Sequence, residues 1–242
     1  MKKNFKILII IPAYNEEQNI LKTCKTIIEF NYKNKNNINY DILVINDGST
    51  DKTEEILNKN KISHIRLIHN LGIGGAVQTG YKYAYEHDYD IAVQFDGDGQ
   101  HDVKYIKNII QPIINDECDM CIGSRFIEKN SDGFKSSRAR RIGINIISFN
   151  IKIKTKSKIY DTTSGFRAVN KNIIKLFSDY YPTEYPEPIS TVRAINHGYR
   201  VLEKPVIMHE RKGGKSSIGS WKNAYYMINV VLSILLSRNG AK

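Results

Sequence analysis

The first half of the chain alternates short apolar runs with amphipathic stretches. The run Lys6–Ile11 is almost continuously apolar and ends at Pro12, which is typical of a strand buried on both faces. Ile20, Cys24 and Ile27 then share one face of a helix. The alternation continues with strands expected at Asp41–Asn46, His64–Ile68, Asp90–Phe95 and Asp119–Gly123, and helices at Asp51–Asn58, Gly75–His87 and Val103–Ile114. This order predicts an α/β fold with a mostly parallel central sheet flanked by helices.

The pattern becomes irregular after Gly123. Residues 128–141 are rich in Lys, Arg and Ser, and Tyr180–Pro188 holds three of the six prolines, so both are expected to be loops. The other expected elements are strands within Asp161–Val169 and Tyr199–Met208, and helices at Arg140–Ile153, Ile189–His197 and Trp221–Leu236. We divide the chain into a main domain, residues 1–219, and a C-terminal amphipathic helix, residues 220–242. That helix is expected either to lie on a membrane surface or to pack against the sheet or a second subunit.

Composition and charge narrow the class of protein. The 242 residues are 41% hydrophobic and 25% charged, which are globular values. The net charge of +11 favours polyanionic partners: phosphorylated substrates, an anionic membrane face or nucleic acid. Nucleic acid is disfavoured because the basic residues are spread out and do not interleave with aromatic residues. The three cysteines form no disulfide framework, and no apolar window reaches the roughly 20 residues of a spanning helix, so we expect a cytoplasmic protein.

The segment after the Asp90–Phe95 strand carries the clearest candidate chemistry. Asp96 and Asp98 are separated by one glycine, so in extended backbone their carboxylates point to the same side. Converging carboxylates suit a hard divalent cation, Mg²⁺ or Mn²⁺, that keeps positions open for phosphate oxygens. The alternative is an acidic turn, since Asp and Gly are ordinary turn residues.

Two more polar motifs follow expected strands and should lie at the same sheet edge, where open α/β sheets bind ligands. Residues 12–17 read PAYNEE, in which Tyr14 can stack on a base, and residues 46–51 read NDGSTD, in which Asp47 can accept a hydrogen bond from a nucleoside. Each motif alone is more often a turn or a helix cap. Residues 70–76 read NLGIGGA, but Val77 stands where a dinucleotide-binding fingerprint requires glycine, so a dehydrogenase is disfavoured.

Taken in order, these motifs resemble those of the family 2 glycosyltransferases. They read IIIPAYNEE, VINDGSTD, NLGIGGAVQTGYKYA, FDGDGQH, GSRF, DTTSGFRA and HERKGGKSS, and the match runs from Ile7 to Ser217. The nearest branch transfers sugars to polyprenyl or dolichyl phosphate. The resemblance implies a glycosyltransferase A-type fold and residues 1–219 as a nucleotide-sugar glycosyltransferase domain.

The resemblance also implies roles for individual residues. Nucleotide-sugar binding falls to Pro12, Tyr14, Glu16, Asp47, Asp96, Arg211 and Ser216, metal binding to Asp96, Asp98 and Gln100, acceptor binding to Arg125, and the reaction centre to Asp161 and Arg167. A phosphate acceptor needs no strong base, but a hydroxyl acceptor does, and for that role we nominate Asp161 or Glu187. For Glu187 the alternative is a helix-entry acid, and for Arg125 and Arg167 it is structural ion pairing.

The expected activity is metal-dependent, inverting transfer of a sugar from a UDP- or GDP-linked donor to polyprenyl phosphate at the cytoplasmic membrane face. A glycan hydroxyl acceptor is the nearest alternative, and a nucleotidyltransferase or a nucleic-acid-binding module are further ones. The basic region around residues 135–158 and the C-terminal helix would contact the membrane surface, with a small integral membrane partner or homo-oligomerisation as further expectations. The loop with Arg211 is expected to close on the diphosphate.

Overall fold

One mixed sheet organises the computed structural model, which describes residues 4–33, 40–127, 138–209 and 222–237. In these ranges, seven strands pair in the order β3-β2-β1-β4-β6-β5-β7. Their bounds are β1 (Ile7–Ala13), β2 (Tyr40–Asn46), β3 (His64–Arg66), β4 (Ile91–Gln94), β5 (Met120–Ser124), β6 (Arg167–Asn170) and β7 (Val201–Pro205). All pairings are parallel except those of β6, which runs antiparallel between β4 and β5. The mostly parallel sheet confirms the expected fold class.

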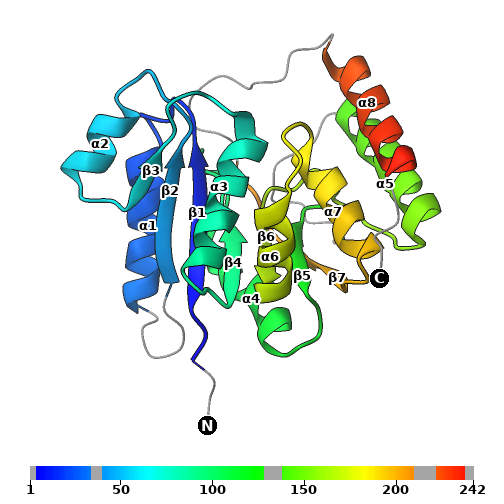
Figure 1. The fold of residues 1–242 in the computed structure, drawn as a ribbon, viewed down its shortest axis with the longest axis horizontal. Helices are drawn as coiled ribbons and strands as arrows, with labels where there is room; N and C mark the ends of the chain where they lie inside the picture. The colour runs from blue at the N-terminus through cyan, green and yellow to red at the C-terminus, as the bar shows by residue number, and fades with distance from the viewer. Residues whose placement is uncertain (1–3, 34–39, 128–137, 210–221, 238–242) are drawn as a thin grey trace.

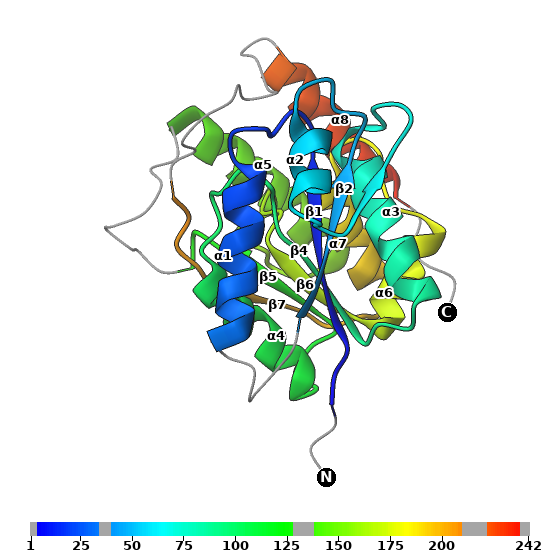
Figure 2. The same cartoon turned by 90° about the vertical axis from the view of Figure 1, so that its left-hand side faces the viewer.

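Helices cover both faces of this sheet (Figures 1 and 2). One face carries α1 (Ile20–Lys33), α2 (Thr53–Lys59) and α4 (Ile106–Ile114), the last preceded by a short 3₁₀ turn at Val103–Tyr105. The other face carries α3 (Gly72–Glu86), α6 (Lys171–Asp179), α7 (Pro186–Asn196), α5 (Arg138–Thr155) and α8 (Lys222–Leu236). This layering buries the central strands on both sides, which explains why β1 reads as an unbroken apolar run.

The alternation of side chains along each strand divides the core into two parts. On β1, Leu8 and Ile10 pack with α3 and α6, whereas Ile7, Ile9 and Ile11 pack with α1 and α4. Each fully buried aliphatic side chain of this kind contributes about 1.5–3 kcal/mol relative to exposure. The sheet is therefore a rigid support for the loops that leave its edge.

Two elements differ from the expectations. The sequence analysis did not identify α6, which follows β6 directly; Asn170 begins it by accepting a hydrogen bond from the Ile173 N–H (3.1 Å). Helix α7 begins at Pro186, inside the segment expected to be a loop, because proline is favoured at the first helical position, where its missing N–H costs nothing.

The helices α5 and α8 pack side by side at one end of the molecule (Figure 1). Ile147 and Ile151 of α5 and Val230 and Ile234 of α8 are buried in the core on the α3 side of the sheet. Among the described residues, no helix combines the length and the apolar character that crossing a bilayer would require.

Candidate functional site

A pocket of about 610 Å³ lies at the carboxyl ends of β1, β2 and β4. Its lining comes from all three polar motifs at these strand ends and from the start of α3: Pro12, Ala13, Tyr14, Asn15, Glu16, Asp47, Asn70, Gly72, Ile73, Ala76, Asp96, Gly97 and Asp98. The fold thus brings together six of the sequence-nominated residues, Pro12, Tyr14, Glu16, Asp47, Asp96 and Asp98.

The loops after β1 and β2 are tied to each other. The backbone N–H of Asn15 donates to Ser49 Oγ (3.0 Å), and Asn15 Oδ1 accepts from the Thr50 N–H (2.8 Å). The Glu16 N–H donates to Thr53 Oγ1 (2.9 Å). Tyr14 lies on this braced loop with 48% of its surface exposed, so its ring is accessible for stacking.

Asp47 lines the pocket and also accepts a hydrogen bond that supports the fold. It is 3% exposed, and its Oδ1 accepts from the Leu71 N–H (2.7 Å) just before α3. Burial raises the pKa of Asp47, and the N–H groups of Leu71 and Gly72 act in the opposite direction. Gly48 makes the tight turn beside it, with φ +66° and the place of a Cβ only 2.9 Å from the Asn70 nitrogen.

Asp96 is held from two sides. The His101 ring, whose side chain is fully buried, has Nε2 3.0 Å from Asp96 Oδ2, while 31% of the Asp96 side chain is exposed. On another side, a Cβ on Gly165 would lie 2.8 Å from Asp96 Oδ2, so only glycine leaves room for this carboxylate. Burial raises the pKa of Asp96, but His101, Gln94 and Arg167 outweigh burial, and the pKa lies below its usual value.

The donor set at this end of the pocket fits a hard divalent cation. Asp96 and Asp98 supply carboxylate oxygens, which Mg²⁺ and Mn²⁺ prefer. In the part of the chain that the structure describes, no three His, Cys, Asp or Glu side chains gather around one point. Two carboxylates would leave coordination positions for water and for substrate phosphate oxygens, as is usual for Mg²⁺.

Gln100 connects the acidic loop to the segment after β7. The Gln100 side-chain Nε2 donates to the backbone carbonyl of His209 (3.2 Å). The backbone carbonyl of Gln100 accepts from the His209 N–H (2.8 Å). The Gln100 N–H donates to Asp98 Oδ1 (3.0 Å). Gln100 thus lies next to the carboxylate pair but has its amide nitrogen engaged with backbone.

Arg125 and Asp161, nominated for acceptor binding and for the reaction centre, form a bidentate ion pair with each other. The Nε–Oδ2 and Nη2–Oδ1 distances are both 2.7 Å, and Nη2 also donates to Thr163 Oγ1 (3.0 Å). Their side chains are 7% and 0% exposed. This is the structural ion pairing that the sequence analysis gave as the alternative for Arg125.

Arg167 is the first residue of β6 and is fully buried. Its guanidinium donates to the Ser164 carbonyl (3.1 and 2.7 Å), to the Glu187 carbonyl (3.1 Å) and to Ser190 Oγ (3.0 Å). These bonds join the turn before β6 to the first turn of α7. In this structure Arg167 positions backbone and is shielded from any ligand in the pocket.

Glu187 lies in the first turn of α7 and is half-buried. Burial raises the pKa of its carboxyl; Arg167 lowers it and Asp96 raises it further. The carboxyl is thus close enough to Asp96 and Arg167 for their charges to act on it. The remaining nominated residues, Arg211 and Ser216, lie outside the described residues.

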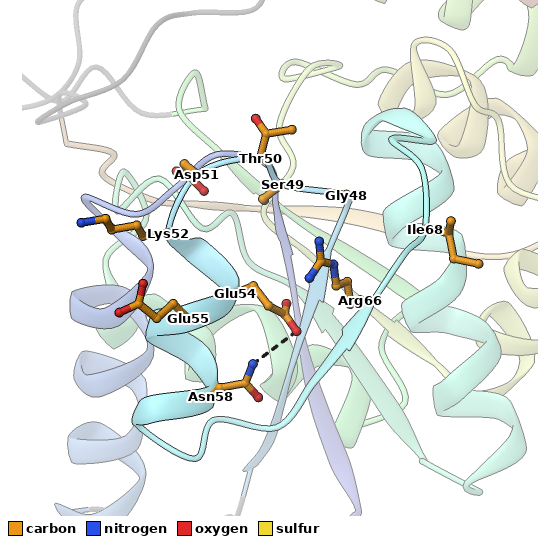
Figure 3. Close-up of a pocket in the computed structure, with 10 residues that line it drawn as sticks. All are labelled: Gly48, Ser49, Thr50, Asp51, Lys52, Glu54, Glu55, Asn58, Arg66 and Ile68. Carbon is orange, nitrogen blue, oxygen red and sulfur yellow. Dashed lines mark hydrogen bonds between the residues drawn. The ribbon is translucent and has the colours of Figure 1, made fainter.

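A second pocket, of about 680 Å³, is lined by the loop after β2, by α2 and by residues of β3 and just after it (Figure 3). Its lining includes Asp51, Glu54 and Glu55 together with Arg66. Glu54 also accepts from Asn46 Nδ2 (2.5 Å) and lies 3.2 Å from His64 Nε2. These bonds fasten α2 to the edge of the sheet, so Glu54 has structural partners.

Sequence reasoning missed three residues of the site. His101 was read only as the end of a motif, although a histidine five positions after Asp96 was a visible signal. Gly165 and Glu203 gave no local signal, because their roles arise from contacts across the sheet. Glu203 of β7 accepts from the N–H groups of Tyr160 (2.7 Å) and Asp161 (2.8 Å), and so holds the backbone that presents Asp161.

Comparisons with known proteins show which sequences and structures this chain is similar to. Residues 8–177 match the family described as Glycosyl transferase family 2. The chain is 37% identical over 194 residues to UDP-N-acetylglucosamine–dolichyl-phosphate N-acetylglucosaminyltransferase of Methanococcus voltae, covering 72% of each chain. It is 34% identical over 207 residues to an uncharacterised protein of Methanocaldococcus jannaschii, covering 83% of this chain and 80% of that one.

A solved structure shows the same fold. Glucosyl-3-phosphoglycerate synthase from Mycobacterium tuberculosis, in complex with Mn²⁺, UDP and phosphoglyceric acid, aligns with a TM-score of 0.68. The alignment covers 98% of this chain and 80% of that one, at 15% identity. At this identity the likeness concerns the fold.

Proposed function

The chain belongs to glycosyl transferase family 2 and has the glycosyltransferase A-type fold, so it is a glycosyltransferase, and we propose that it transfers a sugar from a nucleotide-sugar donor to polyprenyl phosphate with inversion. The proposal includes dependence on Mg²⁺ or Mn²⁺ and peripheral association with the cytoplasmic membrane face. The observation that carries it is the single pocket lined by Tyr14, Asp47, Asp96 and Asp98.

The pocket supports a nucleotide-sugar donor through the groups that line it. Tyr14 offers an accessible ring for a base, and Asp47 lines the same pocket as the two carboxylates. In this proposal Asp96 and Asp98 bind the divalent cation that neutralises the charge of the diphosphate. A divalent cation bound there would stabilise the nucleoside diphosphate as it leaves. We propose UDP as the nucleotide, because the name of the Methanococcus voltae relative specifies a UDP-linked sugar.

A lipid phosphate is the proposed acceptor on two grounds. The same relative is named for transfer to dolichyl phosphate. A phosphate is also ionised at neutral pH, so it attacks without a strong general base, and the buried pairing of Asp161 with Arg125 is consistent with that. In this proposal Arg125 and Asp161 shape the acceptor end of the site through their pair.

Peripheral membrane contact is supported by an exposed apolar face on α5 and α8. On α5 the residues Ile142, Ile146, Phe149 and Ile153 recur at helical spacing and are 45–63% exposed. On α8, Ile228, Leu232, Leu235 and Leu236 are 44–77% exposed. Around the C-terminal end of α5, Lys152, Lys156 and Lys158 are exposed as well, and their charge matches an anionic bilayer. From the C-terminal end of α5, the chain continues through Lys156 and Lys158 to Asp161.

The proposal is tested by incubating the purified protein with UDP-linked sugars, polyprenyl phosphate and Mn²⁺, and identifying the product by mass spectrometry. We expect a glycosyl phosphoryl polyprenol and free UDP. The Asp98→Asn variant serves as the inactive control, because it removes a metal-binding charge at the surface of the pocket. Release of UDP without lipid product from every donor would contradict the lipid acceptor.

A glycan hydroxyl acceptor is the second candidate, and Glu187 is the observation that favours it. The raised pKa of its carboxyl, in a half-buried position near Asp96, is a property of general bases. With a hydroxyl acceptor, Glu187→Gln should abolish transfer; with a phosphate acceptor it should retain much of the activity.

A further inference from the structure

His101 is buried in an aromatic environment beside the proposed metal site. Its ring centroid lies 4.8 Å from that of Phe166 and 5.3 Å from that of Phe95. Phe95 precedes the acidic loop and Phe166 belongs to the turn before β6, so the imidazole lies where two parts of the site meet. A ring enclosed in this way has little freedom to rotate.

One nitrogen of this ring contacts Asp96, and the other is buried. Nε2 lies 3.0 Å from Asp96 Oδ2, and Nδ1 has no hydrogen-bond partner among the residues that the structure describes. A carboxylate only accepts hydrogen bonds, so the tautomer that makes this contact carries its proton on Nε2. A buried nitrogen without a partner is unfavourable, which indicates that the ring is kept there for its contact with Asp96.

The backbone also fixes the direction from which His101 approaches. Its strand-like bridge to Met208 holds the residue antiparallel to the segment after β7. On another side, the Gly165 backbone lies so close to the Asp96 carboxylate that a Cβ on residue 165 would not fit. Asp96 is therefore confined between the His101 ring and the Gly165 backbone. Asp98, in contrast, accepts the Gln100 N–H from within its own loop.

We propose that His101 is a positioning residue for metal binding: it holds Oδ2 of Asp96 so that this carboxylate meets a divalent cation in one orientation. The inference rests on the proposed metal dependence and assigns a role that neither the sequence motifs nor the comparisons give. Partners of metal ligands commonly change metal affinity about 10- to 100-fold when removed.

The test measures Mn²⁺ binding directly, by the loss of the free Mn²⁺ signal in electron paramagnetic resonance, with UDP present. His101→Phe keeps a ring but removes the N–H donor, and we expect about 10- to 100-fold weaker binding. His101→Gln keeps a donor at about the position of Nε2, and we expect affinity close to wild type. The matched control is His64→Phe, which removes a His–carboxylate contact of 3.2 Å on β3 outside the pocket.

The outcomes separate this role from a structural one. Thermal unfolding of each variant shows whether the fold is intact. A loss of Mn²⁺ affinity in His101→Gln as large as that in His101→Phe would mean that an N–H donor at this position does not restore binding, and the proposal would be wrong. Wild-type affinity in His101→Phe would overturn it while leaving the proposed function intact. If the wild-type protein itself binds no Mn²⁺, both the metal dependence and this role fail.

Discussion

Arg125 and Asp161 hold each other in a bidentate ion pair whose members are 7% and 0% exposed. The pair closes a loop between the end of β5 and the turn before β6, and Glu203 secures that turn from β7. Two residues nominated for separate roles in catalysis are thus one structural unit. We expect substitution of either residue to change the shape of the turn before β6 as well as its charge.

Removing Arg125 should therefore destabilise the fold. Arg125→Ala leaves the Asp161 carboxylate buried without its counter-ion, and breaking such a pair from one side costs about 3–5 kcal/mol. Urea unfolding followed by circular dichroism measures the loss. Asp161→Asn in the Arg125→Ala background should recover part of it, because the uncompensated charge is gone. Arg200→Ala is the control, since Arg200 pairs with Asp116 and Asp119 at the surface and should cost far less.

Transfer should require the carboxylates at the end of β4. Asp96→Asn and Asp98→Asn should each abolish sugar transfer, and chelation of divalent cations should do the same to the wild-type protein. Activity is measured by UDP release, and folding by thermal unfolding. Full activity in excess chelator would contradict metal dependence.

Loss of Asp47 should weaken nucleotide binding by roughly 1–3 kcal/mol if a charged hydrogen bond to the nucleoside is lost. Asp47→Asn keeps an oxygen that can accept the Leu71 N–H, so it separates nucleotide contact from the structural bond. Calorimetry with UDP measures the affinity. Asp51→Ala is the control: it removes the acceptor for the Thr53 N–H (2.9 Å), in the adjacent pocket, and should leave UDP affinity unchanged. Unchanged UDP affinity in Asp47→Asn would contradict the assignment.

The stability conferred by residue 187 should depend on pH. Burial raises the pKa of Glu187, so the folded protein holds this proton more tightly than the unfolded chain does. The resulting stability is present below the ordinary glutamate pKa and is lost as the pH rises through the folded value. As the pH rises above the ordinary glutamate pKa, the urea midpoint of Glu187→Gln should therefore increase relative to that of the wild type. The exposed neighbour Glu184→Gln is the control, and an identical profile for the two variants would count against a buried carboxyl.

Binding to anionic vesicles should depend on the exposed face of α5. At low salt we expect flotation with vesicles; high salt should reduce this binding without erasing it, because basic residues contribute about 1 kcal/mol each through screened attraction. The double variant Phe149→Ser, Ile153→Ser should lose most of the vesicle binding that persists at high salt. Ile28→Ser, which is 49% exposed on α1, is the control. Deleting α8 is a poorer test, because Val230 and Ile234 are buried in the core. A protein that stays at the bottom of the gradient at low salt would exclude intrinsic membrane binding.

The sequence by itself determined the strands and the edge at which chemistry gathers. An unbroken apolar run such as Ile7–Ile11 can only be a strand or helix buried on all sides, and its length and the following Pro12 favour a strand. Because parallel strands end at one edge, Asp47, Asp96 and Asp98 had to lie near one another. These are local or periodic properties, which a chain carries in its order of residues.

Only the tertiary structure decided what those residues touch. The antiparallel direction of β6 is not encoded in its own four residues, Arg167–Asn170, and it is this strand that carries the buried Arg167. The pairing of Arg125 with Asp161 spans 36 positions, and the bonds from Arg167 to the first turn of α7 span 20 and 23. Charge and residue type named these side chains as candidates. Burial and the competition among nearby acceptors, which arise only when distant segments pack together, determined that they bind one another.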